Sequence, residues 1–281
     1  MWQEQGEISG DNLQPVSHLE QVSVRCKQRM TNVIFMVNLA EEAKPGRNTP
    51  YTYSKLSWKH YADRCGAEIF VLEERIFQEE FMNANWHKTY ALKLLDSQGI
   101  DYDKVLIVDG DTIVHPEAPN IFDAVGRSFC AVHNEGSYDW VFRSYENYSK
   151  MLFGGFEFDP FRYFNSGFMI VNKDHKEFMN QVVNYYLDNY KKILHMQRTY
   201  GVGTDQPVLN FIAHMKLDDI LILPYEWNMQ EMARREILTE DLLFTKYGWV
   251  YHFNGINPHD HVGPWMKHTY EKLYADEYVN D

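Results

Sequence analysis

Short runs of consecutive apolar residues alternate along the first part of the chain with segments of helical spacing. Apolar runs at residues 32–40, 67–74 and 105–108 are typical of strands that are covered on both faces. Residues 54–66 and 85–98 repeat apolar side chains every three or four positions, and each segment ends at or just before a glycine that acts as a stop signal. The side chains expected to face inward are Leu56, Tyr61 and Ala62 in the first helix and Trp86, Tyr90, Leu94 and Leu95 in the second. This βαβαβ order predicts an α/β, Rossmann-like fold in which helices flank a mostly parallel central sheet.

The alternation continues towards the C-terminal part of the chain. Further strands are predicted at residues 128–133, 166–172, 219–224 and 248–253, and further helices at 177–194 and 205–214. Without an internal repeat or a clear linker, the pattern predicts a single domain over residues 31–281, preceded by an N-terminal extension over residues 1–30. Residues 134–164 are an excursion rich in aromatic side chains. They form either a satellite core or an aromatic wall on the acceptor side of a ligand site, and both interpretations stay open.

Two carboxylates follow the apolar run at 105–108 directly. Asp109 and Asp111 are separated only by Gly110, so in an extended chain both side chains point to the same side. Two anions this close repel each other unless a cation or a shared proton lies between them. Because ligands of open α/β sheets collect beyond the carboxyl ends of the strands, the pattern predicts a metal site there.

Amino-acid composition limits the kinds of partner that the protein can bind and the cellular compartments in which it is expected. The 27 basic and 40 acidic residues give a formal net charge of −13, which argues against a nucleic-acid partner. Cys26, Cys65 and Cys130 are odd in number and lack CxxC spacing, so neither a disulfide framework nor a zinc site is expected. No apolar run approaches the roughly 20 residues of a transmembrane helix, and the polar N-terminal segment is unlike a signal peptide. A cytoplasmic protein is the expectation.

Four sequence blocks resemble those of a known enzyme family. They are "VDGDTIV" (108–114), "FNSGFMIVN" (164–172), "TDQPVLN" (204–210) and "HFNG" (252–255). In this order they resemble nucleotide-sugar glycosyltransferases of the GT-A fold, most closely family eight, which includes glycogenin and bacterial galactosyltransferases. The resemblance covers roughly residues 30–265 and implies a GT-A nucleotide-diphospho-sugar transferase fold.

The resemblance also implies roles for particular residues. Asp109, Asp111 and His252 match the metal ligands, and hard oxygen ligands with one imidazole suit Mn²⁺ or Mg²⁺. Asp205 and Gln206 match the pair that touches the donor sugar near its reacting carbon. The positions implied to contact the donor or the acceptor are Asn38, Lys88, Asp109, Gly110, Asn165, Ser166, Gly167, Gly255 and Lys267.

Simpler interpretations stay open for several of these residues when they are considered alone. Thr204 or Asp205 starts a helix with Pro207 in its first turn, so a helix cap would account for Asp205. The sequence is equally compatible with Lys88 as a solvated surface lysine and with His252 as a solvated histidine. Asn165, Ser166 and Gly167 would also suit a plain turn ahead of a strand.

One block departs from the family pattern. The final family block usually continues HxxGxxKPW, and its lysine contacts the diphosphate, but this chain reads "HFNGINPHDHVGPWMK" from residue 252. No lysine precedes Trp265. Lys267, His259 or His261 is expected to take over the missing charge.

The resemblance implies transfer of a sugar from a nucleotide-diphosphate sugar, expected to be a UDP-sugar, to a hydroxyl of a saccharide or another acceptor. Retention at the anomeric carbon is implied as well. Inversion would require a carboxylate base, for which the sequence offers Asp205, Asp139, Glu157 and Asp159. Two alternatives remain, a GT-A-like sugar-nucleotide-binding protein without turnover and, more remotely, a haloacid-dehalogenase-like phosphatase. The segment 225–236, with Arg234 and Arg235, is a second candidate acceptor region.

Overall fold

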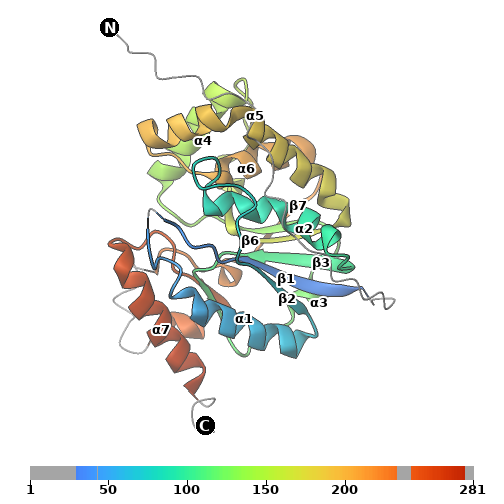
Figure 1. Ribbon diagram of the computed structural model, residues 1–281, viewed down its shortest axis with the longest axis vertical. Coiled ribbons are helices and arrows are strands. Elements are labelled where there is room, and N and C mark those ends of the chain that lie inside the picture. Colours follow the sequence, from blue (N-terminus) through green and yellow to red (C-terminus); the bar gives the residue numbers. More distant parts are fainter. Residues whose placement is uncertain (1–29, 43, 233–241, 276–281) are drawn as a thin grey trace.

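A six-stranded sheet forms the centre of the computed structural model, which describes residues 30–42, 44–232 and 242–275 (Figure 1). Its strand order is β2-β1-β3-β6-β5-β7. In chain order the strands are β1 (Thr31–Val37), β2 (Glu68–Leu72), β3 (Tyr102–Val108), β5 (Phe129–His133), β6 (Phe164–Asn172) and β7 (Ile220–Leu223). The α/β fold with a mostly parallel sheet is therefore confirmed.

Strand β6 runs opposite to its two neighbours, whereas the other strand pairs of this sheet are parallel. Its first residues consequently lie at the edge where β3 and β5 end, and the Asp109 amide donates to the Gly167 carbonyl at 3.0 Å. The predicted start of this strand at residue 166 was two residues late, because Phe164 and Asn165 already pair with β5. Asn165, Ser166 and Gly167 are thus strand residues and not a turn ahead of a strand.

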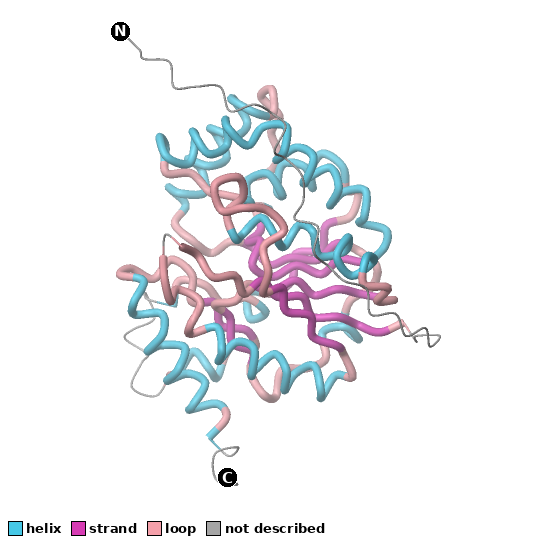
Figure 2. Tube along the Cα trace, viewed as in Figure 1, coloured by secondary structure: helices cyan, strands magenta, loops and turns pink. Residues whose placement is uncertain are grey.

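Two layers of helices cover the sheet, as the tube in Figure 2 shows. The helices are α1 (Tyr51–Cys65), α2 (Ala91–Ser97), α3 (Ile121–Ala124), α4 (Tyr138–Leu152), α5 (Lys176–Tyr200), α6 (Asp205–Lys216) and α7 (Val262–Leu273). Alternate residues of β1 point to opposite faces. Val33 and Phe35 belong to the core shared with α2, α5 and α6, and Ile34 and Met36 to the core shared with α1 and α3.

A second, two-stranded sheet lies beside the first. It pairs β4 (Thr112–Val114) with β8 (Val250–His252) in antiparallel register, so that Thr112 lies opposite His252. This small sheet packs with α7 around a third apolar cluster that includes Ile113, Tyr251 and Met266. The pairing joins segments that are far apart in the sequence and brings His252 next to the Asp109–Asp111 turn.

Two helix predictions require correction. Leu56 is 46% exposed, so it does not face the core. The inward face of α1 carries Trp58, Tyr61 and Ala62 together with two small serines, and Ser57 accepts a hydrogen bond from the amide of Val114. Residues 85–98 do not form one continuous helix. A 3₁₀ helix, η2 (Ala84–Tyr90), precedes α2, and its residues 86–90 are all buried, more than one face of an α-helix can cover.

Within the described residues, no helix combines the length and the apolar character needed to cross a membrane. Cys65 and Cys130 are free thiols. Cys26 and the predicted N-terminal extension, apart from Met30, lie outside the part of the chain that is described.

Candidate active site

A cavity opens at the edge of the main sheet where β1 and β3 end and β6 begins. Most of the residues predicted to carry chemistry line this cavity, although they come from distant parts of the chain. They are Lys88, Asp109, Gly110, Asp111, Asn165, Ser166, Asp205, Gln206, His252 and Gly255. Their convergence places the candidate active site at the edge that the strand pattern indicated.

The turn between β3 and β4 is held in place by the hydroxyl group of Thr112. Thr112 Oγ1 donates to the Asp109 carbonyl at 2.7 Å and accepts a hydrogen bond from the Trp58 indole at 2.9 Å. A side chain at Gly110 would not fit, because a Cβ there would lie 2.5 Å from the Tyr51 ring. The turn therefore holds Asp109 and Asp111 on a rigid support rather than on a free loop.

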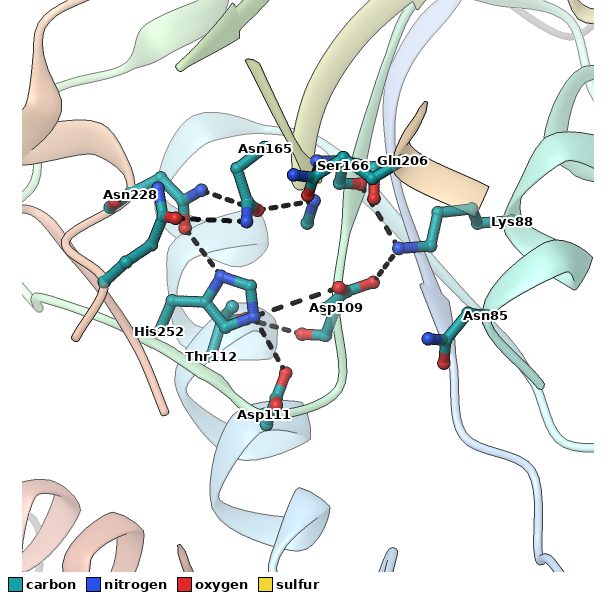
Figure 3. A network of polar contacts seen from close by, with 12 residues as sticks. Asn85, Lys88, Asp109, Asp111, Thr112, Asn165, Ser166, Gln206, Asn228 and His252 are labelled. Carbon is teal, nitrogen blue, oxygen red and sulfur yellow. Dashed lines mark hydrogen bonds and ion pairs between the residues drawn. The ribbon is translucent and has the colours of Figure 1, made fainter. Parts of the chain in front are cut away.

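His252 completes a cluster with the two carboxylates, and one ligand atom of each residue lies within 4.8 Å of the others (Figure 3). His252 Nε2 is 3.1 Å from Asp111 Oδ1 and 3.8 Å from Asp109 Oδ2. The imidazole is almost fully buried. The interpretation of His252 as a solvated histidine is therefore wrong.

A relay of amide side chains determines which nitrogen of His252 carries a proton. The backbone amide of Gly167 can only donate, and it donates to Asn165 Oδ1 at 2.8 Å. Asn228 Nδ2 donates to the same oxygen, which turns Asn228 Oδ1 towards His252 Nδ1 at 3.0 Å. Nδ1 therefore carries a proton, and in the neutral ring the Nε2 lone pair faces the carboxylates.

The position of the Nε2 lone pair of His252 tests whether the cluster suits a metal ion. A bare Nε2 and a carboxylate oxygen at 3.1 Å are both acceptors, so they repel each other unless a cation or a proton lies between them. Two carboxylates and one oriented imidazole are a donor set that Mn²⁺ or Mg²⁺ accepts. The residues present therefore fit a divalent metal ion.

Close packing around Gly167 keeps the cluster compact. A Cβ at this position would lie 2.3 Å from His252 Cε1 and 2.8 Å from Asp109 Oδ2. Neither group has room to retreat, because His252 is held by Asn228 and Asp109 by the turn. The glycine of the second sequence block thus allows the strand backbone to approach both ligands.

Lys88 is buried between the carboxylates, with only 2% of its side chain exposed. Its ammonium group forms an ion pair with Asp109, lies 3.5 Å from Asp205 Oδ2, and donates to the Ser166 carbonyl at 3.3 Å. Burial alone would lower the pKa of Lys88, but the two carboxylates outweigh it and raise that pKa. The interpretation of Lys88 as a solvated surface lysine is therefore wrong.

The pKa values of the Asp109 and Asp111 carboxyl groups are shifted in opposite directions. Burial raises the pKa of Asp109, against the effects of Lys88 and His252. Burial also acts on Asp111, but the charge and the hydrogen bond of a His252 ring protonated at both nitrogens outweigh burial and lower the pKa of that carboxyl. The site therefore holds one carboxylate that is stabilised as an anion and one that depends on neighbouring cations.

Asp205 and Gln206 start α6 but do not cap it. The N-cap residue is Thr204, and it makes no side-chain capping bond. The Asp205 carboxylate accepts hydrogen bonds from Ser166 Oγ at 2.8 Å and from Thr204 Oγ1 at 2.7 Å. Gln206 accepts from the Ser166 amide and donates to Asn134 Oδ1, both at 3.1 Å. The cap interpretation of Asp205 is wrong, because its carboxylate faces the cavity.

Other predicted residues lie at the rim or away from it. Asn38 accepts a hydrogen bond from Asn48, while its neighbours Val37 and Leu39 line the cavity. His259 reaches the rim, but Lys267 lies 56% exposed on α7 beside Glu271. The structure therefore does not bring Lys267 to the site. Arg234 and Arg235 lie outside the described residues.

The aromatic excursion serves mainly as a satellite core. Tyr145 and Phe158 pack on Phe211 of α6, and Phe153 stacks on the same ring. Trp140 is the aromatic residue of this excursion that lines the cavity. Most of these aromatic residues thus form a satellite core, and the aromatic wall on the acceptor side stays a prediction for which Trp140 of α4 is the candidate.

Several site residues were missed from the sequence. Asn134 and Asn228 orient the predicted residues, and Arg47 and Tyr51 line the cavity. Asn228 lies in a segment without a recognisable pattern. Arg47 carried a usable signal, since it follows a strand that ends at the ligand-binding edge, but its polar surroundings resemble an ordinary surface loop.

Solved glycosyltransferase structures are similar to this chain. A glycosyltransferase involved in the glycosylation of the major capsid of PBCV-1 matches 85% of this chain and 99% of its own length, with a TM-score of 0.59 at 15% identity. The galactosyltransferase LgtC, in complex with donor and acceptor sugar analogues, matches 87% of this chain and 95% of its own, with a TM-score of 0.50 at 15% identity. No protein-family model and no curated protein sequence matches the chain. The fold is that of the GT-A glycosyltransferases.

Proposed function

We propose that the protein is a metal-dependent glycosyltransferase that moves a sugar from a nucleotide-diphosphate sugar, a UDP-sugar in the first instance, to an acceptor hydroxyl. The observation that carries the proposal is the convergence of Asp109, Asp111 and His252 with Asp205 and Gln206 in one cavity of a glycosyltransferase fold. A saccharide acceptor fits the wall formed by Trp140, because sugar rings pack their C–H faces on aromatic rings.

Asp109, Asp111 and His252 would hold Mn²⁺ or Mg²⁺. When bound, such an ion neutralises the charge that develops on the leaving diphosphate. The role of the chain itself is to present the ligands in a fixed geometry. The Thr112 hydroxyl holds the turn, and Asn228 holds the imidazole with Nε2 directed towards the carboxylates.

Asp205 and Gln206 would position the donor sugar at its reacting carbon. Ser166 forms hydrogen bonds with both side chains. The ammonium group of Lys88 lies between Asp205 and Asp109 and offsets the negative charge of both. Lys88 thereby keeps two carboxylates close together in a cavity that must also accept an anionic substrate.

Retention at the anomeric carbon is part of the proposal. Inversion needs a carboxylate that takes the acceptor proton, whereas the Asp205 carboxylate is already engaged by the Ser166 and Thr204 hydroxyls and paired with the Lys88 ammonium. The other candidate bases, Asp139, Glu157 and Asp159, are absent from the described lining of the cavity. NMR of the product's anomeric proton tests this point, and an inverted product would exclude retention.

The first experiment is thermal unfolding with UDP, GDP, ADP and CDP, each with and without Mn²⁺. A ligand that binds only the folded state raises the melting temperature as ln(1 + [L]/Kd) rises. We expect one nucleotide to stabilise the protein in a Mn²⁺-dependent manner. Stabilisation without turnover of any sugar donor would favour the binding-protein alternative. Phosphatase activity on a phosphomonoester would instead revive the haloacid-dehalogenase alternative. A cytoplasmic location stays an expectation supported by the free thiols.

A further inference from the structure

The diphosphate side of the cavity lacks the lysine that the family block would supply. Lys267 is exposed on α7 and paired with Glu271 at 3.7 Å, so it is not placed to bind a ligand in the cavity. A nucleotide diphosphate nevertheless brings several negative charges next to Asp109 and Asp111. A second cation on this side, in addition to the metal ion that Asp109, Asp111 and His252 would hold, would offset this charge, and Lys267 does not supply it.

Lys88 is not placed to fill this role, because its ammonium group is already engaged by three oxygens. It donates to Asp109 and to the Ser166 carbonyl, and it forms an ion pair with Asp205 at 3.5 Å. The described lining of the cavity contains one further lysine or arginine side chain besides Lys88, and this is Arg47. His259 also lines the rim, but burial and the nearby Arg47 charge lower its pKa and favour the neutral imidazole.

Arg47 is held loosely compared with Lys88. It comes from the connection between β1 and α1, of which residues 38–42 and 44–50 are described. Its nearest carboxylate, Glu41, lies 3.6 Å away, beyond hydrogen-bonding distance, and its Nε is buried without a hydrogen-bond partner. A buried guanidinium nitrogen without an acceptor is costly, and a phosphate oxygen would satisfy it.

The loop is nevertheless anchored at a defined place. Asn48 donates to Asn38 Oδ1 at 3.0 Å, and the loop leads directly into Tyr51, whose ring packs against Gly110 of the metal-binding turn. Burial and the Asp111 charge raise the pKa of the Tyr51 hydroxyl, while its hydrogen bond with Arg47 opposes this rise. Arg47 therefore lies next to the turn at residues 109–111.

We infer that Arg47 binds the diphosphate of the donor and replaces the lysine missing from the final block. This inference rests on the proposed function. The planar guanidinium offers two parallel N–H groups to phosphate oxygens, a geometry that an ammonium group cannot reproduce. Asn38 then acts as a positioning residue, because it holds the loop that carries Arg47.

The test is isothermal titration calorimetry with UDP and with UMP in saturating Mn²⁺, repeated with the GDP and ADP pairs if UDP does not bind. Arg47→Met keeps the aliphatic stem and removes the charge, so diphosphate binding should weaken about 10- to 100-fold. Monophosphate binding should change much less. Arg47→Lys should restore part of the loss, and Lys267→Met should bind within about twofold of the wild type.

Controls separate the inference from the proposed function. Affinity for Mn²⁺ alone should be unchanged or tighter in Arg47→Met, because a positive charge near Asp111 has gone, and thermal unfolding should confirm the fold. Unchanged diphosphate affinity in Arg47→Met, or equal losses for mono- and diphosphate, would overturn the inference. A wild-type protein that binds no nucleotide diphosphate would instead overturn the proposed function, and the inference with it.

Discussion

Two parts of the cavity are built in different ways: its rim and the side that carries Asp109, Asp111 and His252, which is the proposed metal-binding side. On the metal-binding side, Asp109 and His252 belong to strand ends, and each is fixed by hydrogen bonds to residues that are themselves held. At the rim, Arg47 and His259 come from connecting segments and have few close partners. In the proposed enzyme, this construction would keep the geometry of the metal ligands constant while the groups that meet the nucleotide adjust.

The largest effect is expected from removing a ligand on the metal-binding side. Asp111→Asn keeps the size of the side chain but removes a charge, so Mn²⁺-dependent turnover should fall by about 10³-fold or more. Thermal unfolding of the metal-free variant should show that the fold is retained. Wild-type-like turnover would contradict the assignment of Asp111 as a metal ligand.

Removing the buried cation should affect stability more than any change at the rim. Lys88→Met leaves Asp109 and Asp205 without their shared partner, so the free energy of unfolding without metal should fall by about 3–5 kcal/mol. Urea denaturation measures this loss, and Lys267→Met is the exposed control, with an expected change of at most about 0.5 kcal/mol. Similar losses in both variants would show that Lys88 is not the charge that holds the carboxylates together.

The amide relay provides a smaller but more specific test. Asn228→Leu removes the acceptor for His252 Nδ1, so Mn²⁺ affinity should weaken about 10- to 100-fold. Asn228→Asp keeps an acceptor and should bind Mn²⁺ more tightly than the leucine variant. Mn²⁺ titration followed by electron paramagnetic resonance gives the affinities. Nitrogen-15 NMR of the metal-free wild type should show His252 protonated at Nδ1, and a neutral ring protonated at Nε2 alone would refute the relay.

The smallest effects are expected from substitutions of two glycines, Gly255 at the rim and Gly167 beside the proposed metal ligands. Gly255 has a φ of +66°, and no atom lies within 4 Å of the place that a Cβ would take. Gly255→Ala should therefore cost only about 1 kcal/mol of stability and leave Mn²⁺ affinity intact. Gly167→Ala would push a methyl group into His252 and Asp109 and should weaken Mn²⁺ binding. Equal Mn²⁺ affinities in the two variants would show that the close packing around Gly167 does not matter.

Local pattern and the four blocks were enough to predict much of the fold and the residues that meet in the Asp109–Asp111–His252 cluster. The apolar run before Asp109 and the alternation of strands and helices are local signals, and the four blocks placed His252 and Asp205. The reversed direction of β6 was not predictable, because the direction of a strand follows from its pairing and not from its own apolar residues. Burial of Lys88 depends on carboxylates from β3 and α6, which no single segment reveals.

The pairing of β4 with β8 has a consequence for biosynthesis. A ribosome completes Asp109 and Asp111 long before it reaches His252, so a nascent chain has two carboxylates of the site but not the imidazole. The cluster can close only after β8 has been translated and docked beside β4. A chain that lacks β8 keeps the two carboxylates without the imidazole, so its affinity for a divalent ion should be weaker than that of the full chain.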